Sequence, residues 1–176
     1  YILSVLSCVK YHNIIKLLKA FKIYLKENNS KIKFVLVMQV LDKDYFKEIE
    51  SYIRYNFTNN EIILLQGIKS EYLSGLYKNA QLYLFSSYCE VFGLTSLEAM
   101  SQGCPVLISN NSALPEINLD ACIYFNPDNE TEIKDKIYKI LNDQNLKNDL
   151  ISRGLNHAKN FTWEKNLTET LSVIEK

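Results

Sequence analysis

The sequence lacks the features that mark nucleic-acid-binding and membrane proteins. It has no excess charge of either sign, because 20 lysines and arginines balance 20 aspartates and glutamates. A domain without a positive surplus is a poor partner for nucleic acid. No apolar run approaches the roughly 20 residues that cross a bilayer, and no segment reads as a signal peptide. We therefore expect a cytoplasmic protein that binds no nucleic acid.

Sequence motifs for structural metals and for dinucleotides are also missing. The chain has four cysteines, and no two of them have the CxxC spacing of a metal or redox site. They lie in or beside expected strands, so we expect buried, reduced thiols at Cys8, Cys89, Cys104 and Cys122. The five glycines form no GxGxxG turn, which disfavours a dinucleotide oxidoreductase, one alternative for a doubly wound fold.

What the chain does contain is a regular alternation of apolar strands and amphipathic helices. The strands are expected at 2–7, 32–39, 61–65, 81–86, 105–109 and from Ala121. Helical stripes follow most of them, the first capped by Asn13, and three helices close the chain. Near-continuous apolar strands between helices indicate a parallel sheet covered on both faces. We predict one α/β domain, a Rossmann-like sheet of about six strands with helices on both faces.

The stretch 86–117 carries the chemistry. Glu90 and Glu98 stand with seven residues between them, around a turn that contains Gly93 and opens a helix over 95–102. In a parallel sheet such a turn lies at the carboxyl ends of the strands, where helix N-terminal amides favour an anion. The expected ligand is a phosphate.

Several short motifs surround the two glutamates. They are Ser86-Ser87-Tyr88, Val91-Phe92-Gly93-Leu94, Glu98-Ala99-Met100, Gly103-Cys104-Pro105-Val106, Leu114-Pro115-Glu116 and Phe161-Thr162-Trp163. In this order they strongly resemble the donor-binding domain of retaining GT-B glycosyltransferases of the group 1, or family 4, type. The resemblance covers nearly the whole chain.

This resemblance implies that residues 1–176 form the donor-binding half of a longer enzyme. The partner of this domain would be a nucleotide sugar, and an N-terminal acceptor domain would lie outside the chain, so that the fragment alone is inactive. The whole enzyme would transfer a hexose to a glycan or a lipid-linked acceptor, and any peripheral membrane association would come through the absent domain. No cofactor and no metal are implied, because helix amides and basic side chains would neutralise the diphosphate.

The resemblance also assigns roles to residues. Glu90 would be catalytic, orienting the donor sugar and stabilising positive charge at the anomeric carbon. Glu98 would accept hydrogen bonds from the ribose hydroxyls, although its spacing from Thr95 also fits a capping box. The turn residues Phe92, Gly93, Leu94 and Thr95 would present amides, and Thr95 a hydroxyl, to the diphosphate. As bulky side chains, Tyr88, Phe92 and Trp163 are expected to pack.

The first loop departs from the family pattern. Where many members have an arginine and a lysine that reach the diphosphate, this chain has Ser7 and His12. His12 supplies positive charge only when it is protonated, and Lys10 is near enough in sequence to substitute. The loss of two fixed charges supports an alternative function, a non-catalytic nucleotide-sugar-binding or scaffolding module.

Overall fold

A computed structural model describes residues 1–58 and 60–175 and contains one sheet. Its six strands are all parallel and lie in the order β3-β2-β1-β4-β5-β6. The strands are β1 (Ile2–Cys8), β2 (Phe34–Val40), β3 (Ile62–Gln66), β4 (Leu82–Phe85), β5 (Val106–Ser109) and β6 (Ile123–Phe125). The six expected strands are confirmed, and none of their ends differs from the prediction by more than two residues.

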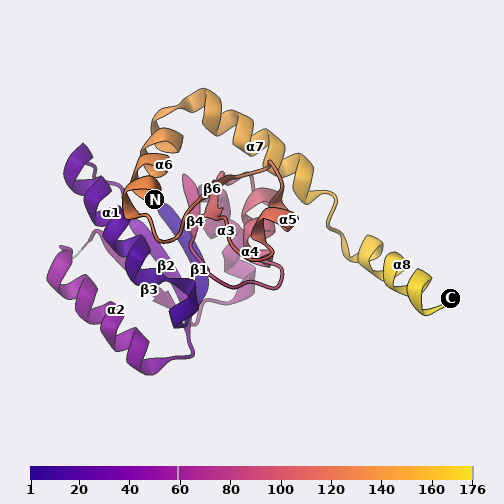
Figure 1. Cartoon of the computed structure of the whole chain (residues 1–176), viewed down its shortest axis with the longest axis horizontal. Helices are drawn as coiled ribbons and strands as arrows, with labels where there is room; N and C mark the ends of the chain where they lie inside the picture. Colours follow the sequence, from indigo (N-terminus) through magenta and orange to yellow (C-terminus); the bar gives the residue numbers. More distant parts are fainter. Residues whose placement is uncertain (59, 176) are drawn as a thin grey trace.

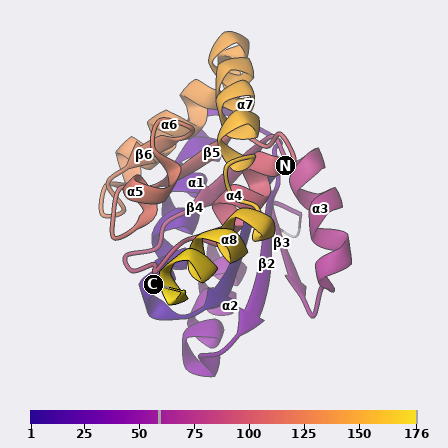
Figure 2. The ribbon, with the colours of Figure 1, turned by 90° about the vertical axis from the view of Figure 1, so that its right-hand side faces the viewer.

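Helices cover both faces of the sheet (Figures 1 and 2). The helices are η1 (Lys10–His12), α1 (Ile14–Asn28), α2 (Lys43–Asn56), α3 (Ser70–Asn79), α4 (Leu94–Ser101), α5 (Leu114–Asn118), α6 (Glu130–Asn142), α7 (Gln144–Ala158) and α8 (Trp163–Ile174). On one face α1 packs between α2 and α6, and on the other α4 packs against α3 and α7. In the described ranges, no helix is long and apolar enough to span a bilayer.

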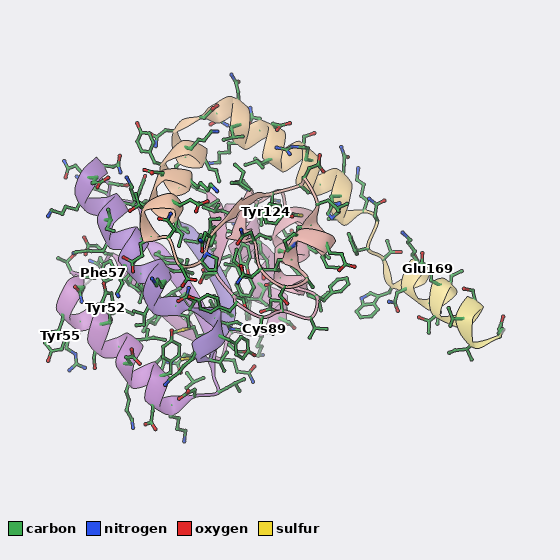
Figure 3. All side chains as sticks on the ribbon, in the orientation of Figure 1. Tyr52, Tyr55, Phe57, Cys89, Tyr124 and Glu169 are labelled. Carbon is green, nitrogen blue, oxygen red and sulfur yellow. The ribbon has the colours of Figure 1, made fainter. Side chains whose placement is uncertain are left out.

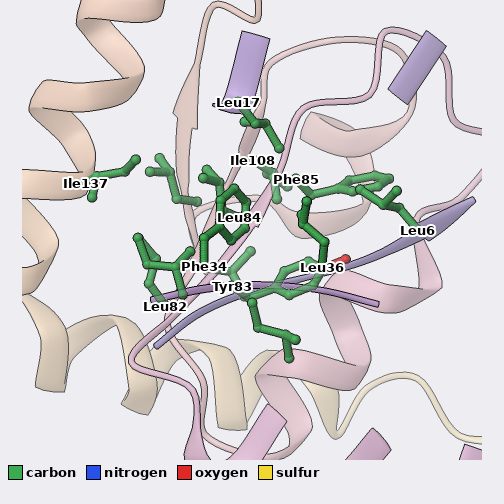
Figure 4. Packing of buried hydrophobic residues seen from close by; sticks show 14 of the residues in the cluster. Leu6, Leu17, Phe34, Leu36, Leu82, Tyr83, Leu84, Phe85, Ile108 and Ile137 are labelled. Carbon is green, nitrogen blue, oxygen red and sulfur yellow. The ribbon is translucent and has the colours of Figure 1, made fainter. Parts of the chain in front are cut away.

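The core lies between these layers because the inner strands bury both of their faces. In β2, Phe34 through Val37 are all buried, which explains the unbroken apolar run in the sequence. Leu17 of α1 and Ile137 of α6 are fully buried on one side of the sheet (Figure 4). Tyr83 of β4 points to the other side, where its ring lies 5.6 Å from that of Tyr77 in α3.

The strand order places a topological switch point between β1 and β4. The chain runs from β1 outward to β2 and β3, then crosses back to β4 on the other side of β1. Loops that follow β1 and β4 therefore leave the same edge in opposite directions and open a crevice. A backbone hydrogen bond of 2.8 Å from Tyr88 N to Tyr11 O, and one from Ser86 Oγ to the His12 carbonyl at 2.8 Å, join the two loops.

Some local predictions are wrong. Asn13 precedes α1 but has a left-handed backbone, and its side chain donates to the Pro127 carbonyl instead of capping the helix. Trp163, expected to pack, is 85% exposed at the start of α8. That helix projects from the body of the domain (Figure 1) and buries none of its described side chains.

The chain also contains one Asp-x-Asp triplet, a spacing that can hold a divalent cation. Asp42, Lys43 and Asp44 form it, directly before and within the first turn of α2. Asp42 Oδ1 accepts from the backbone N–H groups of Asp44 and Tyr45, and Asp44 pairs with Lys47 at 2.9 Å. These contacts identify the triplet as an N-terminal helix cap.

Candidate functional site

A cleft of about 940 Å³ opens at the carboxyl ends of the central strands. Its floor comes from the last residues of β1 and β2, and its wall from the loop between β4 and α4. Among the predicted site residues, His12, Glu90, Phe92, Gly93, Leu94 and Thr95 line it, whereas Lys10 and Glu98 do not. The cleft lies at the switch point, the usual ligand site of open parallel sheets.

The cleft brings His12 and Glu90 into contact across 78 positions of sequence. His12 Nε2 lies 3.1 Å from Glu90 Oε1, and Nδ1 lies 2.5 Å from the Ser7 carbonyl oxygen. The His12 side chain is 8% exposed and is flanked by the rings of Tyr11 and Phe85. The two ring nitrogens are thus both engaged, Nδ1 by a main-chain carbonyl and Nε2 by the Glu90 carboxyl group, which fixes the orientation of the ring.

The backbone of Glu90 is held separately from its carboxylate. Ser112 Oγ accepts from the Glu90 N–H at 3.2 Å and donates to the Glu90 carbonyl at 2.7 Å. Ser112 was not predicted as a site residue, although the polar run 110–112 after the buried strand β5 marks a loop. Ser112 therefore holds the main chain of Glu90, and His12 holds its carboxyl group.

Gly93 sets the direction of α4. Its φ of 84° lies in the left-handed region, and a Cβ at this position would come 2.5 Å from Leu114 Cδ2. Leu94 and Thr95 follow as the first residues of α4. N–H groups in the first turn of a helix have no carbonyl partner within that helix, so they are donors for an anion in the cleft.

Glu98 lies one turn further along α4 and lines a neighbouring hollow of about 320 Å³. Phe92 and Leu94 line both spaces. Glu98 Oε2 accepts from the Tyr77 hydroxyl at 2.9 Å, and Thr95 Oγ1 accepts from the Tyr83 hydroxyl at 2.7 Å. Gly93 precedes the helix without a side-chain cap, so the Thr95–Glu98 capping box is wrong.

The cysteines differ from the expectation at one position. Cys8, Cys104 and Cys122 are buried free thiols, as expected, but Cys89 (labelled in Figure 3) is exposed and lines the cleft beside Glu90. Burial raises the pKa of Cys8 to about 11 and the pKa of Cys104 and Cys122 to about 12. These three thiols therefore stay protonated and shielded near neutral pH.

This difference in exposure predicts selective labelling. At pH 8 a disulfide reagent such as 5,5′-dithiobis(2-nitrobenzoic acid) should modify one thiol per folded chain rapidly, because only a reachable thiolate attacks it. All four thiols should react after unfolding, and Cys89→Ser should remove the rapid phase. Two rapid equivalents in the folded protein would show that the buried thiols are accessible.

Comparison with known proteins gives a family and a fold. Residues 1–157 match the family described as "Glycosyl transferases group 1". The O-antigen chain mannosyltransferase B of Escherichia coli is 36% identical over 126 residues, which are 72% of this chain and 31% of that protein. A serotype-specific mannosyltransferase WbdA of Escherichia coli is 28% identical over 163 residues, 93% of this chain and 20% of that protein.

A solved structure has the same architecture. The C-terminal domain of a glycosyl transferase group 1 family protein (LpcC) from Francisella tularensis superposes with a TM-score of 0.79 at 23% identity, covering 91% of this chain and 85% of that one. The likeness confirms the predicted fold, one half of a GT-B architecture. This chain spans 31% of the length of the O-antigen chain mannosyltransferase B and 20% of the length of WbdA.

Proposed function

Because the chain belongs to the group 1 glycosyl transferases, we propose that it is the donor-binding domain of a retaining glycosyltransferase. It binds a nucleotide diphosphate sugar in the switch-point cleft, and the whole enzyme moves the hexose to a glycan or lipid-linked acceptor. The observation that carries this proposal is the convergence of Glu90 and the Gly93–Thr95 turn on one cleft at the carboxyl ends of the strands. The acceptor side belongs to a further, N-terminal domain.

In this proposal the diphosphate binds the first turn of α4. The N–H groups of Leu94 and Thr95 and the Thr95 hydroxyl donate to its oxygens, and Gly93 lets it approach the backbone closely. Lys10, exposed in η1 next to the cleft-lining Tyr11, supplies a positive charge to the diphosphate in this proposal. These donors stabilise the leaving diphosphate, so the proposed reaction includes no metal.

The two glutamates then serve different parts of the donor. Glu98, on the far side of Phe92 and Leu94, accepts from the ribose hydroxyls. Glu90 faces the donor sugar, and its carboxylate stabilises positive charge that develops at the anomeric carbon. His12 contributes by holding that carboxylate, and thus acts on Glu90 and not directly on the diphosphate. Since two relatives are named mannosyltransferases, mannose is the hexose we propose to test first.

A non-catalytic module remains the second candidate, and the observation that favours it is the first loop. The His12 ring is turned to Glu90 and Ser7 carries no charge, so the loop offers the diphosphate no fixed cation in the cleft wall. Such a domain would bind the nucleotide but support no transfer when joined to its acceptor domain.

Calorimetric titration of this chain tests the proposal. At least one of UDP, GDP and ADP should bind with a dissociation constant in the micromolar to millimolar range. NAD should bind more weakly, because no glycine-rich turn receives its second phosphate. The bound nucleotide should also slow modification of Cys89, which lines the cleft. If the folded chain binds none of the three at millimolar concentration, the donor-site assignment fails.

A further inference from the structure

Two buried tyrosines lie beneath α4 and contact the two side chains that the proposed function places on the ligand. Tyr77 of α3 is 1% exposed and Tyr83 of β4 is fully buried. Their rings pack edge to face, 5.6 Å apart. The Tyr77 hydroxyl donates to Glu98 Oε2, and the Tyr83 hydroxyl donates to Thr95 Oγ1. Nothing in the local sequence marked either tyrosine.

The protonation state of Tyr77 is fixed by its surroundings. Burial, with further contributions from Tyr83 and Glu98, raises the pKa of Tyr77 far above its usual range. The phenol therefore keeps its hydrogen at every physiological pH and acts as a donor. A carboxylate is acceptor-only, so the bond has one direction, from Tyr77 to Glu98.

This bond restrains a side chain that would otherwise rotate freely. Glu98 is exposed on α4 and belongs to no ion pair of the described residues. The buried Tyr77 ring engages Oε2, whereas no hydrogen bond of the described residues uses Oε1, so Oε1 stays available to a ligand. A pre-oriented acceptor loses less conformational entropy when a ligand binds.

We propose that Tyr77 is a positioning residue for donor recognition: its hydroxyl holds one oxygen of Glu98 so that the other faces the ribose hydroxyls of the nucleotide. The inference rests on the proposed function and adds a residue from α3, outside the cleft, to the recognition of ribose. Tyr77 itself touches no ligand, so its removal should act through Glu98 alone.

The test compares Tyr77→Phe with wild type in calorimetric titrations of the whole chain. The variant keeps the ring and loses the hydroxyl, and the Kd of the nucleoside diphosphate should rise roughly three- to tenfold, the range for the net contribution of one typical hydrogen bond. The 2′,3′-dideoxy form of the same nucleotide should bind wild type more weakly and should bind Tyr77→Phe equally weakly. In a Glu98→Ala background, Tyr77→Phe should have no further effect.

Tyr1→Phe is the matched control, because the Tyr1 hydroxyl donates to the Leu76 carbonyl at 2.7 Å, on the same helix but away from Glu98. It should leave the Kd unchanged. Tyr77→Met removes the hydroxyl with a flexible, smaller apolar side chain and repeats the test if Tyr77→Phe does not fold.

The titrations separate a failure of the positioning role of Tyr77 from a failure of the proposed function. If wild type binds the ribonucleotide better than the dideoxy form but Tyr77→Phe leaves the Kd unchanged, the positioning role is overturned alone. An equal loss for ribo- and dideoxynucleotides overturns it as well, since the hydroxyl would then act on general stability. If wild type binds no nucleoside diphosphate, the proposed function fails and the positioning role with it.

Discussion

Replacing Glu90 by glutamine should lower the turnover of the complete enzyme by about a hundredfold or more, the loss typical of removing one preorganised electrostatic group. The amide keeps the size of the carboxylate but not its negative charge, which is what the proposed transition state requires. Affinity of this chain for the free nucleoside diphosphate should stay unchanged, because that ligand lacks the sugar. Steady-state kinetics and calorimetry measure the two effects separately.

Three further variants support the interpretation of the Glu90 result. Glu98→Ala should instead weaken the affinity for the free nucleoside diphosphate, by roughly tenfold or more. His12→Ala, which removes the partner of the Glu90 carboxylate at 3.1 Å, should lower turnover less than Glu90→Gln does. Glu48→Gln, at an exposed position of α2, should change neither quantity. Equal losses of nucleotide affinity in the Glu90 and Glu98 variants would contradict separate roles for the two glutamates.

Gly93→Ala should destabilise the fold by about 1–3 kcal/mol and weaken nucleotide binding with it. The backbone at this position has φ of 84°, which costs a residue with a Cβ about 1 kcal/mol or more. The new methyl group would also press on Leu114, which is fully buried and has little room to move. Urea denaturation gives the free energy of unfolding for the comparison.

Gly75→Ala provides the matched control. Gly75 lies in α3, has no positive φ, and a Cβ there meets no heavy atom within 4 Å. Alanine should stabilise this helix by about 0.5–1 kcal/mol, since it has the higher helix propensity. If both variants change the free energy of unfolding equally, the left-handed backbone at Gly93 does not constrain the start of α4.

The strands were predictable because their signal is local. A strand of a doubly covered parallel sheet buries successive side chains on both faces, so residues 34–38 of β2 form an unbroken apolar segment in the sequence itself. The start of α4 was placed to within one residue for a similar reason: Gly93 permits a backbone conformation that other residues avoid, and it directly precedes the helix. The spacing of Glu90 and Glu98 predicted a donor site only together with the motifs around it, such as the turn at Gly93.

Contacts between distant segments were not predictable in the same way. The capping box at Thr95 was a reasonable local prediction, but α4 begins one residue earlier, after Gly93, and the Thr95 hydroxyl accepts from the Tyr83 hydroxyl, 12 positions earlier. Trp163 and the apolar residues of α8 have the composition of a packed helix, yet the described residues bury none of them. Whether an amphipathic face is covered depends on what lies opposite it in space, which the segment itself does not encode.

By itself the sequence determined the strand and helix order, the turn at Gly93 and the pair of glutamates, because backbone preference and hydrophobic periodicity act within a few residues. Only the tertiary structure decided the partners of those glutamates. β4 adds to β1 on the side opposite β2, and this pairing brings the loops that carry His12 and Glu90 together. The packing of α3 against α4 likewise sets the Tyr77 hydroxyl on Glu98. Such contacts arise from how whole elements cross, so chain position alone does not specify them.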